Sequence, residues 1–183
     1  YEELDSLFYN EIVNSKFKSQ LEKEYGKQFI KICELSLKSF SKEIIKELQE
    51  ENRLCSKYTK LLASAKIEFE GKELNLSQLG KFMSNRDRNI RKKSSEAYFN
   101  YFYEHEQEFD IIFDELIKLR DKMAKKLGYK NFVELGYVRM MRTDYDSSMV
   151  ENFRKQVLEY IVPVCNKLYE RQAKRLNINK LTY

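Results

Sequence analysis

The amino-acid sequence predicts an all-α fold of long, kinked helices with one small β-hairpin near residues 66–76. The chain has 183 residues but only 5 Gly and 1 Pro, which is too little turn-forming material for a sandwich or barrel of short strands. Hydrophobic residues make up 42% of it, including 13 Tyr and 12 Phe, which predicts a folded core and not a disordered chain. We therefore expect residues 1–183 to form a single helical lobe.

Apolar residues recur at helical spacing through the first third of the chain. Over residues 2–25 this spacing predicts a helix that ends at Gly26, because glycine readily adopts the left-handed conformation that closes a helix. The spacing continues over residues 27–64, where Ser39 and Ser41 leave open whether there is one long helix or two.

The period changes to two in residues 66–76. Apolar and polar residues alternate there on both sides of residues 70–72, a pattern that predicts a β-hairpin. The alternating apolar residues are Ile67, Phe69, Leu74 and Leu76. Ser77 is then the expected N-cap of a short helix that continues through Met83.

The main predicted helix covers about residues 85–127. Residues 84–87 have the pattern of a capping box, and apolar residues then recur every three or four positions as far as Leu127. Such a stripe predicts a seam buried against partner helices. Lysines in the last turns and Gly128 after them indicate where the helix ends.

Two more helices complete the predicted chain. Residues 131–134 resemble an N-terminal cap, which opens a short helix through about Met141. Residues 148–151 open the last long helix, whose apolar spacing continues through Pro163. We expect the proline to kink this helix without ending it.

Charge and cysteine usage limit the class of protein. The 34 basic and 29 acidic side chains are interspersed and leave a net charge of only +5, which describes a solvated surface and not a nucleic-acid footprint. Cys33, Cys55 and Cys165 form no CxxC pair, so a reducing, cytoplasmic location is expected. No apolar run approaches the roughly 20 residues that cross a bilayer, and no membrane partner is expected.

The sequence His105-Glu106 begins like the HExxH motif of zinc peptidases. In that motif residues i and i+4 share a helix face, so that two imidazoles bind one zinc. Here the i+4 residue is Phe109, and the chain contains a single histidine. A zinc site at His105 is therefore not expected, and His105 is interpreted as a histidine at the edge of the core within the apolar stripe.

Two charged clusters lack the patterns of a metal site or a nucleic-acid-binding site. The acidic cluster lacks the Glu-x-x-His repeat of carboxylate-bridged di-metal bundles, so it is interpreted as a solvated face. Its members are Glu104, Glu106, Glu108, Asp110, Asp114 and Glu115. The basic cluster spreads around its helix and has no nucleic-acid-binding motif beside it. Its members are Arg86, Arg88, Arg91, Lys92 and Lys93.

A third group contains arginines, tyrosines and an aspartate around an expected helix end, in the stretch GYVRMMRTDY. Its members are Tyr137, Arg139, Arg142, Asp144 and Tyr145. Guanidinium groups and phenols suit the binding of peptide carbonyls or a carboxylate. On composition alone, an internal network that ties down a loop is the more common arrangement.

Long stretches of the chain resemble a known family. Residues 50–102, 126–145 and 153–176 are similar to the N-terminal half of bacterial oligoendopeptidase F-type zinc metallopeptidases, relatives of thimet oligopeptidase. The resemblance implies a mostly helical, clamshell-like enzyme with a deep channel that admits short peptides and excludes folded proteins. It also implies a zinc held by two histidines of an HExxH helix and a downstream glutamate, none of which has a counterpart here.

The resemblance makes this chain the non-catalytic lobe of a larger peptidase, with the catalytic lobe absent from it. The chain would contribute one wall of the channel, dock the catalytic lobe, bind no zinc and cleave nothing alone. The group around Arg139 and Arg142 becomes a candidate channel or interlobe element. The isolated lobe is expected to self-associate through its uncovered apolar surface. The alternative is a free-standing helical interaction domain on the same scaffold, without peptidase activity.

Overall fold

The computed structural model describes residues 2–179 and 181, and it confirms a mostly helical fold with a small antiparallel hairpin in that part of the chain. The helices and strands follow in chain order: α1 (Glu2–Val13), α2 (Lys18–Tyr25), α3 (Lys27–Ser39), the 3₁₀ turn η1 (Lys42–Ile44), α4 (Ile45–Ala63), β1 (Ile67–Phe69), β2 (Lys72–Leu74), α5 (Leu76–Gly80), the 3₁₀ turn η2 (Phe82–Ser84), α6 (Arg88–Glu104), α7 (Glu106–Lys126), α8 (Phe132–Arg139), α9 (Ser147–Gln156), the π-helical segment η3 (Val157–Ile161) and α10 (Val162–Leu176).

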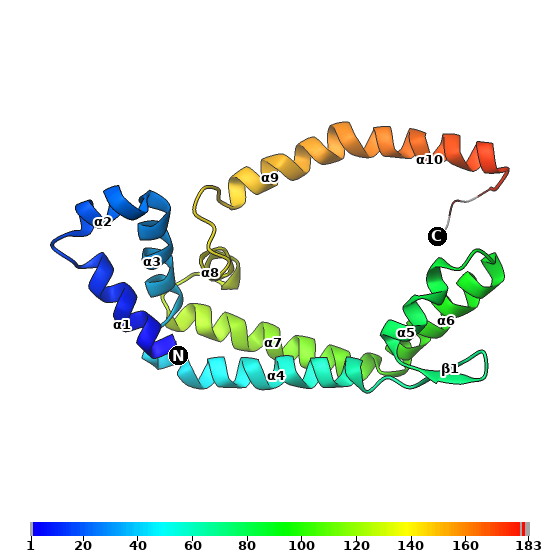
Figure 1. Cartoon of the computed structure of the whole chain (residues 1–183), viewed down its shortest axis with the longest axis horizontal. Coiled ribbons are helices and arrows are strands. Elements are labelled where there is room, and N and C mark those ends of the chain that lie inside the picture. Colours follow the sequence, from blue (N-terminus) through cyan, green and yellow to red (C-terminus); the bar gives the residue numbers. More distant parts are fainter. Residues whose placement is uncertain (1, 180, 182–183) are drawn as a thin grey trace.

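The elements form an open arrangement around one long helix pair (Figure 1). Helices α4 and α7 lie side by side and antiparallel, with α1, α2 and α3 at one end of the pair. The hairpin, α5 and α6 lie at the other end. Helices α9 and α10 continue each other as a curved arm, which extends along the opposite side of the molecule from the α4–α7 pair.

The predicted helix over residues 2–25 is wrong in one respect, because it is broken between α1 and α2. The side-chain amide of Asn14 donates to the Asn10 carbonyl, and the Ser15 hydroxyl accepts from the backbone N–H of Phe17. Short polar side chains offer such local hydrogen bonds as alternatives to the helical ladder. The apolar spacing does not register this competition.

Residues 27–64 form two helices, which decides the alternative that the sequence left open. Phe40 and Ser41 are both extended, and the Ser41 hydroxyl accepts a hydrogen bond from the backbone N–H of Glu43. Serine thus caps the 3₁₀ turn that leads into α4, as serine commonly does at helix starts. The break turns α3 away from α4 and lets α3 pack against α1 and α8.

The predicted hairpin is present, with Ile67 opposite Leu74 and Phe69 opposite Lys72. Its two turn residues, Glu70 and Gly71, have φ angles of 50° and 73°. Two positive φ angles in succession are the geometry of the type I′ turn, which matches the twist of the two strands. Ile67 and Phe69 point to the buried side, as the alternation predicts.

The helix after the hairpin begins earlier than predicted. Leu76 belongs to α5 and not to a strand, and the N-cap is Asn75, so the prediction of Ser77 as the cap is wrong. The Asn75 side chain accepts from the backbone N–H of Gln78, while the Gln78 side chain accepts from the backbone N–H of Asn75. This reciprocal capping box satisfies two backbone N–H groups. A cap at Ser77 could not do this, because the residue three positions later is Gly80, which has no side chain to accept the second hydrogen bond.

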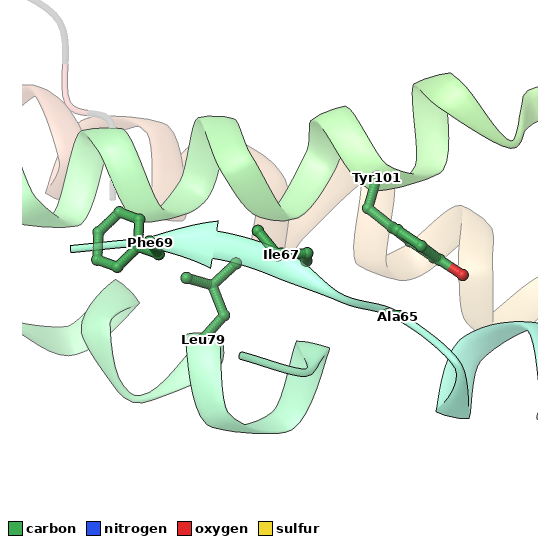
Figure 2. Close-up of a cluster of buried hydrophobic side chains, with 5 residues drawn as sticks. All are labelled: Ala65, Ile67, Phe69, Leu79 and Tyr101. Atoms are coloured by element: carbon green, nitrogen blue, oxygen red, sulfur yellow. The ribbon is translucent and has the colours of Figure 1, made fainter. Parts of the chain in front are cut away.

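A hydrophobic cluster joins the hairpin to α5 and α6 (Figure 2). Its buried members are Ala65, Ile67, Phe69, Leu79 and Tyr101. The Tyr101 hydroxyl donates to the Leu61 carbonyl at the end of α4, at 2.5 Å. A buried tyrosine thus hides its ring and still satisfies its polar end. A second cluster, of Ile44, Met123, Ala124 and Leu135, joins η1, α7 and α8.

The predicted single helix over residues 85–127 is wrong, because it breaks at His105 into α6 and α7. His105 has φ −108° and ψ 16°, outside the helical range. Its ring nitrogen Nδ1 lies 2.9 Å from the Tyr101 carbonyl oxygen, and the two rings lie 4.3 Å apart. His105 is therefore a half-buried junction residue with a hydrogen-bonding partner, and it is not the middle of a continuous stripe.

Helix ends agree with the sequence at Gly128 and Asn131. Gly128 has φ +82°, and the N–H of the next residue donates to the Ala124 carbonyl, which closes α7 in a Schellman motif. The Asn131 side chain accepts from the N–H of Val133 and caps α8. At α9 the cap is Asp146, upstream of the predicted residues 148–151.

The arm continues through Pro163, as predicted. The π-helical turn η3 directly precedes α10. Proline has no N–H to donate to the preceding turn, and its ring would clash with the carbonyl of that turn in a regular α-helix. A widened turn avoids both problems. Within Ser147–Leu176 no residue is buried. The arm is an amphipathic helix whose apolar face has no cover from the described part of this chain.

Candidate functional site

Two carboxylates near the start of α4 organise the end of the α4–α7 pair that lies beside α8. Glu47 and Glu51 are one helical turn apart, so they share the face of α4 that points to α7. Their exposed fractions are only 4% and 5%. Buried carboxylates are rare unless they are paired, and both of these have basic partners on neighbouring helices.

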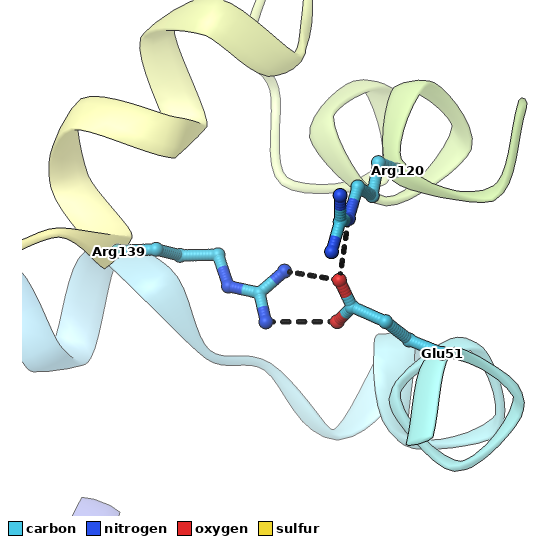
Figure 3. A network of polar contacts seen from close by, with 3 residues as sticks. All are labelled: Glu51, Arg120 and Arg139. Carbon is cyan, nitrogen blue, oxygen red and sulfur yellow. Dashed lines mark hydrogen bonds and ion pairs between the residues drawn. The ribbon is translucent and has the colours of Figure 1, made fainter. Parts of the chain in front are cut away.

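Glu51 binds two arginines from two other helices (Figure 3). Arg139, the last residue of α8, donates from Nη1 and Nη2 to the two carboxylate oxygens at 3.2 and 2.8 Å. Arg120 of α7 donates from Nε to Oε1 at 2.7 Å. The Phe132 ring lies against both guanidinium groups, at 5.5 and 5.9 Å from its centroid. We call these four residues the Glu51 network.

Glu47 receives two lysines from the last turns of α7. The ammonium groups of Lys122 and Lys126 lie 2.9 and 2.8 Å from its Oε1 atom. The other oxygen, Oε2, is buried and has no hydrogen-bond partner among the described residues. Both cations also stand at the negative end of the α7 macrodipole, where positive charge is favoured.

The pKa values of both carboxyl groups are lowered by hydrogen bonds, but burial opposes this effect more strongly at Glu51 than at Glu47. Hydrogen bonds from Lys126 and then Lys122 lower the pKa of Glu47 from 4.5 to about 2. Burial raises the pKa of Glu51, but hydrogen bonds from Arg139 and Arg120 outweigh burial and hold it below its ordinary value. Both side chains are therefore ionised near neutral pH and serve as fixed anions.

The five residues that the sequence grouped as a candidate site do not form one cluster. Arg139 is held by Glu51 and takes no part in a pair with Asp144. Tyr137 is joined to Arg142 through the backbone, because the Arg142 N–H donates to the Tyr137 carbonyl at 3.1 Å. This bond closes α8 in a Schellman motif around Met141, whose φ is 53°.

Beyond α8, the remaining members of that group lie on an exposed connection to the arm. The Arg142 guanidinium stands over the Tyr145 ring at 5.0 Å from its centroid. Asp144 pairs with Lys31 of α3 at 3.4 Å, and Thr143 exchanges hydrogen bonds with Gln28. The connection is thus tied to α3, while Arg142 and Tyr145 remain accessible.

A cleft of about 240 Å³ lies beside Arg139, between α1, α3, α4 and the end of α8. Hydroxyl groups of Ser6, Tyr9 and Ser39 line it together with Met141. The cleft is also lined by Asp5, Phe40 and Leu48, so it combines hydroxyl groups, one carboxyl group and apolar side chains.

Two members of the basic cluster, Arg91 and Lys92, have partners within the chain. Arg91 donates to the carbonyls of Asn85 and Arg86 at 2.7 and 2.9 Å, and Lys92 pairs with Glu96. Among the described residues, no three His, Cys, Asp or Glu side chains lie together as a metal site would require. No helix in residues 2–179 is long and apolar enough to cross a membrane.

Glu47 and Glu51 are in none of the groups that the sequence predicted as candidate sites. A signal was available, because both acids occur at positions of the apolar stripe of α4, between Ile44 and Leu54. A carboxylate at a core position predicts a buried partner of opposite charge. The partners themselves, on α7 and α8, could not be identified from spacing along one helix.

Two sequence profiles match this chain. Residues 1–40 match the profile described as the Peptidase M3 N-terminal domain, and residues 81–183 match Peptidase family M3. The second profile covers more than half of the chain. No curated protein matches this chain.

Several solved structures are similar over the whole chain. A Bacillus anthracis str. Ames protein assigned as an oligoendopeptidase F is 52% identical, with a TM-score of 0.92. PZ peptidase A, solved with an inhibitor, is also 52% identical, with a TM-score of 0.93, and a further assigned oligoendopeptidase F is 47% identical, with a TM-score of 0.93. The alignments cover 34%, 32% and 32% of those chains, so this chain spans about a third of their length.

We predict that Glu51→Gln destabilises the protein by about 3 kcal/mol, the lower end for breaking a buried ion pair, because both arginines remain partly exposed. Denaturant unfolding measures this loss. The matched control is Glu50→Gln, whose partner Arg53 is exposed on the same helix, and it should destabilise the protein much less than Glu51→Gln does. Equal effects of the two variants would contradict a special role for Glu51.

We predict that Glu47 makes stability depend on acid pH. Its folded pKa of about 2 lies below the ordinary value of 4.5, so its contribution is fully present above pH 4.5 and is lost as pH falls towards 2. The Glu47→Gln variant should therefore unfold more easily than the wild type at pH 7, and the difference should shrink below pH 4.5. Denaturant unfolding across this range measures it, and a constant difference would exclude the proposed cause.

Proposed function

Because the chain belongs to peptidase family M3, we propose that it is the N-terminal helical lobe of a zinc-dependent oligoendopeptidase that hydrolyses short peptides. The observation that carries this proposal is 52% identity over the whole chain, at a TM-score of 0.92, to a protein assigned as an oligoendopeptidase F. Identity at this level joins fold and family, whereas a shared helical fold alone would not indicate function.

The proposed role of this lobe is to form a wall of the substrate channel and to dock the catalytic lobe. Large apolar side chains on the arm and on α7 support this role. Leu158 on the arm is 69% exposed and Phe113 on α7 is 66% exposed. Extended apolar surface of this kind is unusual on a free-standing monomer and common where two lobes of one enzyme meet.

The zinc of the proposed enzyme would be held by another part of the protein. The described residues hold no group of three metal-ligating side chains, so the residues present do not fit a catalytic zinc. No chemical step is therefore assigned to this lobe. Its contribution would be to position peptides and to exclude folded proteins, and its free cysteines accord with a cytoplasmic location.

Within the group around α8, the geometry favours Arg142 and Tyr145 as the channel or interlobe element. Their cation–π pair is accessible, and a guanidinium held over a ring retains donors for peptide carbonyls or a carboxylate. Tyr137 and Asp144 would shape the connection that carries this pair. Arg139 would act indirectly, because Glu51 already occupies its donors.

The proposed function is tested on the complete protein and on residues 1–183 produced separately. The complete protein should bind zinc and cleave a short fluorogenic peptide, while residues 1–183 should do neither. Light scattering should show residues 1–183 self-associating through their uncovered apolar surface. Metal analysis and a peptidase assay measure the first two outcomes. A complete protein without zinc or activity would favour the alternative, an interaction domain on the same scaffold.

We predict that Arg142→Ala in the complete enzyme lowers kcat/KM for peptides by about tenfold, equivalent to ~1.4 kcal/mol, with unchanged unfolding behaviour. The reason is that the Arg142 guanidinium contacts the Tyr145 ring and the Met140 sulfur and remains exposed, so its donors are available to a peptide. Arg53→Ala on α4 is the control and should leave kinetics unchanged. Wild-type kinetics in Arg142→Ala would remove Arg142 from the channel.

A further inference from the structure

An apolar groove runs along the α4–α7 pair. It has a volume of about 480 Å³ and is lined, among others, by Cys55, Tyr58, Phe109, Ile112, Phe113 and Arg120. Ile112 forms part of its floor and is 1% exposed, whereas Phe113 on its rim is 66% exposed. We call this feature the α4–α7 groove. Its lining is mostly apolar, with Thr59 and Asp110 as further polar residues beside Arg120.

The groove continues towards the hairpin end of the molecule. A neighbouring cavity of about 580 Å³ shares Tyr58 and Thr59 with it and adds Leu62, Tyr98 and Phe102. The rings of Tyr58 and Phe109 meet edge to face at 5.9 Å across the two helices. At 1.5 Å per residue, the stretch of α4 from Glu51 to Ala63 spans roughly 18 Å, which about 12 helical residues would cover.

One end of the groove carries uncompensated positive charge. In the Glu51 network one carboxylate faces two guanidinium groups, so one positive charge remains. Arg120, which lines the groove, uses Nε for its bond to Glu51. A carboxylate on an occupant of the groove would balance this charge in a partly desolvated position, where charge-assisted hydrogen bonds are strong.

We infer that the α4–α7 groove is the docking site for an amphipathic helix from the remainder of the longer protein, with an acidic side chain directed to Arg120. This inference rests on the function proposed above. Two antiparallel helices leave a ridged groove that a third helix fills, which is how helical layers bury an apolar face. The solved relatives are about three times as long as this chain, so material for such a helix exists in the family.

Cys55 provides a native reporter in the groove. It is exposed in this structure and lines the groove, whereas Cys33 is fully buried. The complete protein carrying Cys165→Ser is labelled with N-ethylmaleimide in the absence of the substrate peptide. Mass spectrometry of its proteolytic fragments then measures the rate at which Cys55 is labelled. The reference is a second variant, Lys60→Cys, at an exposed position about 140° around α4 from Cys55.

The docked helix predicts that Cys55 reacts at least about tenfold more slowly than the reference thiol, because labelling requires local opening of the interface. Phe113→Asp, which adds a charge to the apolar rim, should speed Cys55 labelling severalfold. The matched control is Phe99→Asp on α6, where the phenylalanine is 61% exposed and does not line the groove. This control should leave the Cys55 rate unchanged.

Three outcomes would overturn the inference. Cys55 that labels as fast as the reference, with or without peptide, shows an open groove. Fast labelling that slows only when the assay peptide is added assigns the groove to substrate. Protection that disappears on dilution of the protein assigns it to a second copy. Zinc content and peptidase activity are measured on the same samples, so failure of the proposed function is seen separately from exposure of Cys55.

Discussion

The arrangement of this molecule depends on burying two carboxylates of α4 against basic side chains of α7 and α8. Glu47 and Glu51 lie in the apolar stripe of α4 and are almost inaccessible to solvent. An ionised group in such a position is tolerated only when charged partners replace its water. Lysines from α7 and arginines from α7 and α8 do this, so the two anions fix the register of α4 against α7 and the position of α8.

That constraint reaches the candidate functional surfaces. Arg139 ends α8, and the chain turns at Met141 towards the connection that carries Arg142 and Tyr145. By holding Arg139, Glu51 therefore sets where this connection and the arm leave the body of the lobe (Figures 1 and 3). The same carboxylate also binds Arg120 at the end of the α4–α7 groove, where the two guanidinium groups leave one excess positive charge. One buried carboxylate thus links the proposed channel element to the proposed docking groove.

The helix breaks show where periodicity alone is insufficient. The apolar spacing passes through Asn14–Phe17 and through His105 without interruption, yet both places are junctions. At His105 a ring nitrogen and a neighbouring tyrosine ring stabilise a non-helical backbone, and at Ser15 a hydroxyl does the same. Pro163 is the opposite case. A proline usually ends a helix, but here the helix continues because a π-helical turn precedes the proline. Local side-chain chemistry decides each of these.

The sequence by itself determined the helical class, the presence of the hairpin, the helix ends at Gly128 and Asn131, and the family resemblance, because these depend on local pattern and on long matching stretches. Only the tertiary structure decided the partners of Arg139 and the division of the predicted Tyr137–Tyr145 group. It also revealed the Glu51 network and the α4–α7 groove. The physical reason is that an ion pair or a groove forms between residues distant in the chain, and which charges meet depends on how whole helices pack.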